Sequence, residues 1–166
     1  MDAQIRQTTV EMLEQRGFQV EIEEEYILGR KTRSSVIVFF NSSVKINNDR
    51  IQEYISKMKG LNFVHAIVVH DKAVTPMAQK VVEELQGIRI ELFPMKSLRY
   101  NITKHRLVPR HVPLSKMEMK SFKDLYGTKI PYLLYSDPVA RFYDFQRGDI
   151  IKIERSNGFI CYRIVK

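Results

Sequence analysis

Ser35-Val36-Ile37-Val38-Phe39-Phe40 is the stretch that decides the fold of the first part of this chain. It is a short, nearly continuous apolar run, which is typical of a strand buried on both faces. Similar runs follow at residues 62–70 and 88–93. The segments between them have helical periodicity, so strands and helices alternate here. Because the connections are short, this order predicts a small α/β domain of βαβ units on a parallel or mixed sheet.

Three helices are expected around these strands, over residues 2–16, 48–59 and 76–86. Thr75-Pro76 supplies an N-cap and a first-turn proline for the last of them. Glycines that follow the apolar runs are the expected helix ends: Gly17, Gly60 and Gly87.

The second part of the chain predicts a small α+β domain that ends in a β-hairpin. Residues 94–113 carry three prolines and no clear periodicity, so we expect a linker there, with the domain boundary between residues 99 and 100. Ser115 and Glu118 form a capping-box pair that starts a helix closed by Gly127. That helix is expected to turn four side chains toward a core: Met119, Phe122, Leu125 and Tyr126.

A second helix start and a hairpin turn follow. Asp137 can cap a short helix, and Pro138 suits its first turn. Asn157-Gly158 is the preferred pair for a two-residue type I′ turn. That turn would pair Ile151 with Ile164, Ile153 with Tyr162 and Lys152 with Arg163. Ile160 would then join the apolar face of the hairpin, and Cys161 would lie on the opposite face.

The net charge of +8 is unevenly distributed. Residues 1–100 carry 14 Lys/Arg and 13 Asp/Glu, whereas residues 101–166 carry 13 and 6. The asymmetry indicates two units, the second of which faces a polyanion or an acidic protein surface. A basic face that is merely solvated explains the same counts.

Several classes of protein fit the sequence poorly. No apolar run reaches the roughly 18–20 residues of a membrane span. A single cysteine argues against an internal disulfide or a cysteine-rich zinc site, and the N-terminal residues do not read as a signal peptide, which favours an intracellular protein. The four histidines have no metal-binding spacing, and we expect neither a metal nor a cofactor: His65, His70, His105 and His111.

Catalytic signals are weak as well. There is no Gly-x-Ser-x-Gly elbow and no glycine-rich phosphate loop. A metal-dependent nuclease needs acids at its strand ends, but only Asp71 follows a buried strand. The acidic residues between 21 and 25 are expected in a solvated loop or at a strand edge. The loop 71–76 suits a phosphate better, because Lys72 and Thr75 stand at a helix N-terminus, although a plain helix start is the better explanation of Thr75-Pro76 on this evidence alone.

Three stretches of the second part closely resemble the assembly domain of the shared fifth subunit of eukaryotic RNA polymerases I, II and III, a family with archaeal members. They are residues 107–115 (Leu-Val-Pro-Arg-His-Val-Pro-Leu-Ser), 136–143 (Ser-Asp-Pro-Val-Ala-Arg-Phe-Tyr) and 147–153 (Arg-Gly-Asp-Ile-Ile-Lys-Ile). The closing residues 162–165 are also similar.

The first part resembles the jaw domain of the same subunit at residues 16–18, 74–78 and 100–105. Archaeal versions lack this jaw, so the resemblance points to a eukaryotic or viral chain. The jaw and the tip of the final hairpin are shorter than in the family pattern, which fits a compacted genome or a large DNA virus.

The resemblance implies a non-catalytic polymerase subunit with a jaw-like domain at residues 1–99 and an assembly domain at 100–166. The assembly domain would dock on the largest subunit, and the jaw would support downstream duplex DNA, in a nucleus or in a viral factory or virion. The residues carried over as close to DNA are Lys72, Thr75 and Pro76. Those carried over to the subunit interface are His111, Asp137, Pro138, Val139, Arg141 and Tyr143. The alternative from the residues themselves is a stand-alone nucleic-acid-binding protein or a degenerate nuclease.

Overall fold

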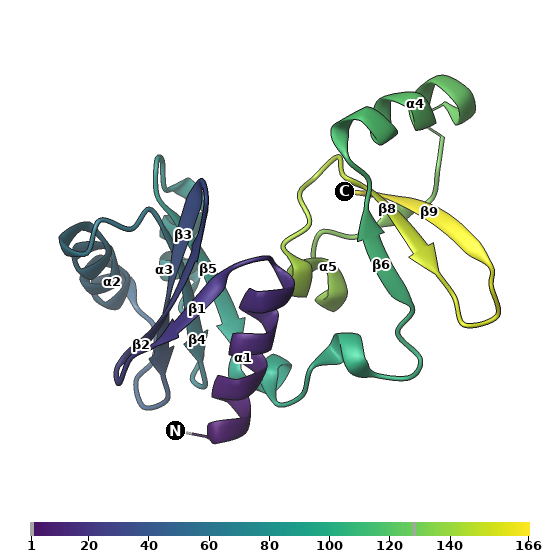
Figure 1. Ribbon diagram of the computed structural model, residues 1–166. Coiled ribbons are helices and arrows are strands. Elements are labelled where there is room, and N and C mark those ends of the chain that lie inside the picture. Colours follow the sequence, from purple (N-terminus) through teal and green to yellow (C-terminus); the bar gives the residue numbers. More distant parts are fainter. Residues whose placement is uncertain (1, 128) are drawn as a thin grey trace. The chain divides into compact units, whose positions relative to one another are not determined.

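The computed structural model of the chain describes residues 2–127 and 129–166. The chain divides into two compact units, residues 1–100 and residues 101–166. Each has its own β-sheet, and together they give the mixed α and β architecture expected from the sequence (Figure 1). None of the described helices is both long and apolar enough to cross a membrane.

Unit 1 is built on a five-stranded mixed sheet in the order β1-β2-β3-β4-β5. The first three strands form an antiparallel meander, and β3, β4 and β5 are parallel. The parallel part contains the three apolar runs of the sequence, which supply buried side chains to both faces. The strands are β1 (Gln19–Ile22), β2 (Tyr26–Lys31), β3 (Ser34–Asn41), β4 (His65–His70) and β5 (Arg89–Pro94).

Helices cover both faces of this sheet (Figure 1). α2 (Asn48–Gly60) and α3 (Pro76–Glu84) follow β3 and β4 and pack on the face that carries Ile37 and Phe39. α1 (Ala3–Gln15) lies on the other face, where the Arg6 guanidinium stands 5.4 Å from the centre of the Phe40 ring. The sheet is therefore the middle layer of three.

The β1–β2 hairpin is the part of unit 1 that the sequence did not predict as strands. Glu21 lies within β1, so this part of the acidic run is at the sheet edge, and residues 23–25 lead into β2. β2 contains Gly29, where a Cβ atom would lie 2.8 Å from Val36 Cγ1. The glycine and the exposed acids hide the strand pattern, although the glycine is what allows close packing here.

Two of the predicted helix ends are wrong in detail. Gly60 is still helical, and Asn62 supplies the left-handed residue after α2, with φ of 58°. α3 ends at Glu84, three residues before Gly87. At α1 the predicted end is confirmed, because Arg16 is the C-cap and Gly17 has φ of 83°.

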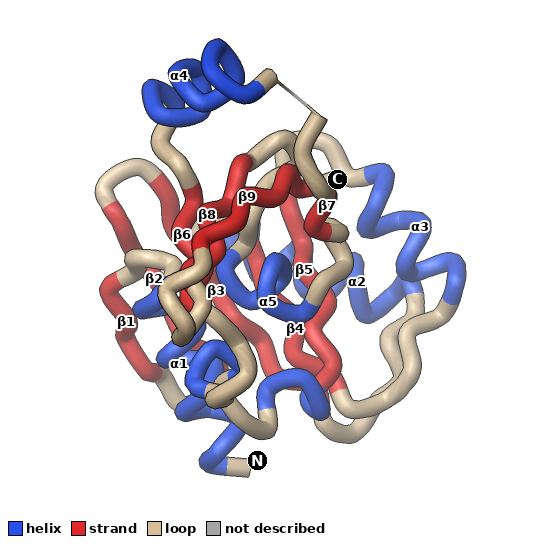
Figure 2. Tube along the Cα trace, turned by 90° about the vertical axis from the view of Figure 1, so that its right-hand side faces the viewer, coloured by secondary structure: helices blue, strands red, loops and turns tan. Residues whose placement is uncertain are grey.

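Unit 2 is built on a four-stranded sheet in the order β6-β8-β9-β7. One face packs on α5 (Pro138–Tyr143), which contributes Ala140 to the core. Phe122 of α4 (Lys116–Tyr126) packs against Tyr162, with ring centres 4.6 Å apart, and α4 stands apart from α5 in Figure 2. The strands are β6 (Arg110–Pro113), β7 (Tyr132–Leu133), β8 (Ile150–Glu154) and β9 (Ile160–Val165).

The expected linker at residues 94–113 is structured instead. It contains the 3₁₀ helices η1 (Met95–Leu98) and η2 (Ile102–Lys104), and then the edge strand β6. Met95 and Leu98 are buried in unit 1, and Asn101 is buried in unit 2. The sequence did not predict these elements, because the segment has three prolines and each element is too short to show a hydrophobic period.

The predicted register of the final hairpin is wrong by one residue. Ile153 pairs with Cys161 and Lys152 with Tyr162, so Lys152 does not face Arg163. Only Gly158 of the turn has positive φ, 80°, and its N–H donates to the Arg155 carbonyl at 2.9 Å. A type I′ turn needs two such residues, so the loop has three residues, 156–158, rather than two. As a result Cys161 packs on the core, whereas Ile160 is 45% exposed.

The predicted start of α4 is confirmed, but its apolar face is only partly buried. Both hydrogen bonds of the Ser115–Glu118 capping box are present. Phe122 is 9% exposed, whereas Leu125 and Tyr126 are 76% and 69% exposed. Two of the side chains expected in a core therefore lie on the surface of unit 2.

Candidate functional site

The segment 136–143 forms a sharply defined helix start in unit 2. Asp137 caps α5 by accepting a hydrogen bond from the Val139 N–H at 2.8 Å, and Pro138 is the first helical residue, as predicted. The helix ends after six residues at Asp144, which has φ of 60°. Caps at both ends therefore fix this short helix on the sheet.

Not all residues of this segment are available to a partner. Val139 is only 7% exposed, and Tyr143 packs against the core and stacks on Phe145, with ring centres 5.2 Å apart. Arg141 is half-buried, and Pro138 is exposed. Val139 and Tyr143 thus pack in the core of unit 2, although Tyr143, like Asp137 and Arg141, is partly exposed, and Pro138 is exposed.

His111 on β6 lies close to this helix start. Burial lowers the pKa of His111, whereas the Pro109 carbonyl, 2.7 Å from Nδ1, and the charge of Asp137 act to raise it. The positive charge of Arg163 lowers the pKa further. The charges of Asp137 and Arg163 thus act on His111 from two other elements. Sequence reasoning missed Arg163, because β6 and β9 are brought into one sheet by the pairing of both strands with β8.

The loop at residues 71–76 of unit 1 joins β4 to α3. Thr75 caps α3 through the Ala78 N–H at 3.2 Å, and its own N–H donates to the Ile46 carbonyl at 2.9 Å. Lys72 is exposed and pairs with the exposed Asp71 at 3.4 Å. Pro76 is exposed at the first position of α3. Both predicted features of the helix start, the Thr75 cap and the Pro76 position, are confirmed.

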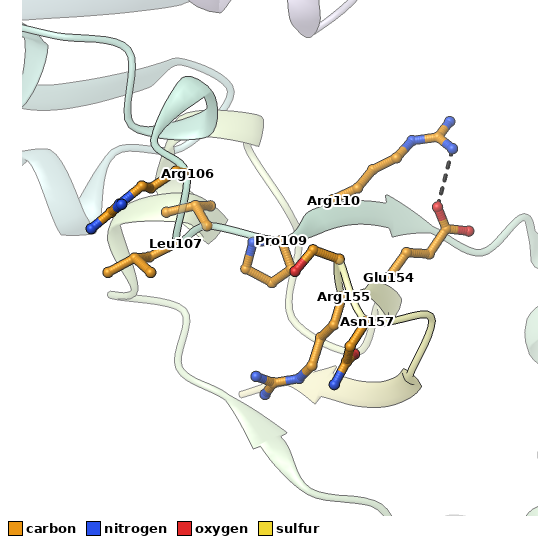
Figure 3. Close-up of a pocket in the computed structure, with 9 residues that line it drawn as sticks. Arg106, Leu107, Pro109, Arg110, Glu154, Arg155 and Asn157 are labelled. Carbon is orange, nitrogen blue, oxygen red and sulfur yellow. Dashed lines mark hydrogen bonds and ion pairs between the residues drawn. The ribbon is translucent and has the colours of Figure 1, made fainter.

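A further hollow in unit 2 was not predicted from the sequence. It has a volume of about 440 Å³ and lies between residues 106–110 and the hairpin turn. Figure 3 shows these two segments, with Arg110 paired to Glu154 at 3.1 Å. The lining residues that carry positive charge are Arg106, Arg110 and Arg155. The segments are more than 40 residues apart, and only the β6–β8 pairing brings them together.

Most acidic side chains of unit 2 form ion pairs or hydrogen bonds within the unit. Glu154 pairs with Arg110 and with Lys152, at 3.1 and 2.8 Å. Glu118 serves the capping box, and its hydrogen bonds with Ser115 lower its pKa. Asp137 caps α5, and Asp149 accepts from the Gln146 N–H at 2.7 Å. The surplus of basic side chains is therefore presented outward. Over residues 2–127 and 129–166, no group of three metal-binding side chains is present.

Comparison with known proteins identifies the family of this chain. Residues 100–165 match the model of the RNA polymerase Rpb5 C-terminal domain. A protein of Invertebrate iridescent virus 6, described as a DNA-directed RNA polymerase subunit, is 33% identical and covers 96% of this chain and 97% of its own length. The chain belongs to the RNA polymerase Rpb5 family. This confirms the family expected from the sequence.

Cellular members of the Rpb5 family are similar over both units. The Dictyostelium discoideum subunit rpabc1 of DNA-directed RNA polymerases I, II and III is 31% identical over 97% of this chain and 95% of the relative. The Caenorhabditis elegans subunit RPABC1 is 32% identical over 78% of this chain and 65% of the relative. The family relationship thus includes unit 1, which lies outside the C-terminal domain match.

Proposed function

We propose that this Rpb5 family protein is a non-catalytic subunit of a multisubunit DNA-directed RNA polymerase. Unit 2 is the assembly domain that docks on the largest subunit, and unit 1 is the jaw that supports downstream duplex DNA. The observation that carries the proposal is the similarity to polymerase subunits over 96% and 97% of the chain, through both units.

The surface of unit 2 supports a docking role. Asp137 and Arg141 stand on one short helix that is fixed by its cap, and His111 lies nearby on β6. Charged groups held in fixed positions orient a partner without a large loss of conformational entropy. The outward surplus of basic side chains favours a partner with an acidic surface.

The loop at residues 71–76 supports contact with DNA. The positive end of the α3 dipole and the exposed ammonium of Lys72 suit a phosphate, and contacts of this kind position a duplex without reading its sequence. A stand-alone nucleic-acid-binding protein or a nuclease would use the same loop, but the family relationship does not favour it.

The docking proposal is tested with the double variant Asp137→Asn and Arg141→Glu. Asparagine keeps the helix cap and removes the charge, so folding is preserved while the interface changes. The tagged chain is isolated from its host, and the largest polymerase subunit that accompanies it is quantified by mass spectrometry. We expect at least a tenfold loss.

Lys72→Glu is the matched control, because it changes a surface charge in unit 1 and should leave the association intact. Full retention of the largest subunit by the double variant would refute the docking site. Loss of the largest subunit in Lys72→Glu would refute the division of roles between the two units. We expect the protein in the nucleus or in a viral factory or virion.

A further inference from the structure

The hollow of unit 2 is separate from the polar group formed by His111, Asp137 and Arg163. Its walls are the segment at residues 106–110 and the turn that carries Arg155 and Asn157 (Figure 3). Arg110 and Glu154, which are paired where β6 meets β8, also line it. Arg106, Arg155 and Asn157 are exposed, so their polar groups are open to a ligand.

The charge in this hollow is not balanced. Three arginines line it, but Glu154 is its only acidic residue, and Lys152 also binds that carboxylate at 2.8 Å. Across residues 2–127 and 129–166, no ion pair is found for Arg106 or Arg155. Guanidinium groups bind carboxylates and phosphates through paired hydrogen bonds, so the hollow selects an anion.

The apolar part of the lining decides which anion fits. Leu107 is 75% exposed at the rim, and Val108 and Pro109 are partly buried beside it. A nucleic-acid backbone offers no apolar groups for such a surface. A peptide offers both carboxylates and apolar side chains. A volume of about 440 Å³ has room for a few side chains but not for a duplex.

The peptide would not bind by adding a strand to the sheet. β6 is the edge strand beside the hollow, but it has only four residues and ends in Pro113, with Pro109 just before it. Proline has no N–H to donate, so it blocks strand addition. Recognition therefore has to come from side chains, which makes arginine the main source of affinity.

We infer that this hollow binds an acidic peptide segment of a partner protein, with carboxylates on Arg106 and Arg155 and an apolar side chain on Leu107. This goes beyond the proposed docking site, which uses other residues on α5 and β6. Its test contains no polymerase subunit, so the two proposals fail independently.

The test measures binding of a fluorescent peptide, Glu-Glu-Leu-Glu-Glu-Leu, to the purified full chain. Arg106→Glu with Arg155→Glu is expected to weaken binding by at least tenfold, because two charge-assisted hydrogen-bonding groups are lost. Glu154→Gln is expected to strengthen binding, because it frees Arg110 and removes a repelling charge. If charge reversal lowers the midpoint temperature of unfolding, the milder pair Arg106→Gln with Arg155→Gln is used instead.

The matched control is Lys120→Glu with Lys123→Glu, which changes the net charge equally on the exposed side of α4. We expect less than a twofold change. Equal weakening by both pairs would show attraction to overall charge only and would overturn the site. Tighter competition by a 20-base-pair duplex than by the peptide, or a lack of peptide binding, would overturn the choice of ligand.

Discussion

The two units of the chain differ in where their charges are neutralised. Unit 1 has nearly equal numbers of basic and acidic residues, and one of its ion-pair clusters is inside the fold, where Glu91 meets Arg16 and His65 at 3.1 and 2.6 Å. Unit 2 has 13 basic and 6 acidic residues, and its acids are bound within the unit. Unit 1 is thus electrostatically self-contained, whereas unit 2 leaves positive charge for another molecule to neutralise.

Exposed apolar side chains follow the same division. Unit 2 is the smaller unit, yet eight of the fourteen large apolar side chains that are exposed on the described residues belong to it. They are Leu107, Met117, Leu125, Tyr126, Tyr132, Leu134, Phe159 and Ile160. Unit 2 therefore exposes more large apolar side chains for its size than unit 1 does.

The largest expected effect comes from removing the buried negative charge of Glu91 in unit 1. Glu91→Gln removes the carboxylate charge that binds Arg16, whose side chain is 2% exposed. Breaking a buried pair from one side costs about 3–5 kcal/mol in the free energy of unfolding. Hydrogen exchange read by mass spectrometry should show faster exchange in β4 and β5 and unchanged exchange in unit 2.

Glu21→Gln is the control for this substitution, because Glu21 and Arg30 form an exposed pair at 3.7 Å. Its cost should stay below about 0.5 kcal/mol. The contrast between the units would fail if both variants behaved alike, or if Glu91→Gln loosened unit 2 to the same extent.

Acid should destabilise the two units at different pH values. Burial acts to raise the pKa of Glu91, but the His65 hydrogen bond and the charges of Arg16 and Arg89 lower it from 4.5 to about 2. The unfolded chain binds this proton first, so unit 1 loses about 3 kcal/mol as the pH falls from about 4.5 toward 2.

Unit 2 should respond at higher pH. Because burial lowers the pKa of His111 below the ordinary 6.5, the unfolded chain takes up this proton first, and stability falls as the pH drops below that value. Hydrogen exchange measured at pH 7, 5.5 and 4 should show that β6 loosens at a higher pH than β5. His111→Gln should abolish the early change, and simultaneous loosening of both sheets would contradict the assignment.

The smallest effect concerns the start of α4. Ser115→Ala removes the hydrogen bond from the Glu118 N–H and should cost about 1 kcal/mol. Exchange within α4 should rise while the strands of unit 2 are unchanged. Glu118→Gln is the control, since glutamine also completes a capping box. A larger loss in Glu118→Gln than in Ser115→Ala would mean that charge, not the cap, holds the helix.

Local signals explain which parts of the fold could be predicted. Thr75, Ser115 and Asp137 were correctly assigned as caps because a cap depends on three or four neighbouring residues. The hairpin register failed because it depends on the conformation of Asn157, which a two-letter turn pattern does not fix. The β1–β2 hairpin failed because it is held by pairing with β3 rather than by its own apolar pattern.

The candidate sites divide in the same way. The sequence located the loop with Lys72 and Thr75 and the helix start at Asp137, since each lies within one short segment. It could not find Arg163 beside His111, or Arg155 across from Arg106, because strand pairing over long distances brings them together.

The prolines at the edge of the unit 2 sheet have a consequence for the life of the protein before assembly. A newly made polymerase component that displays many apolar side chains is at risk of self-association, and an open strand edge is the usual template for it. With Pro109 and Pro113 at the two ends of the four-residue β6, this edge offers little to a second copy. This edge of the unit 2 sheet can therefore stay unpaired until a partner arrives, although apolar side chains of the unit are exposed.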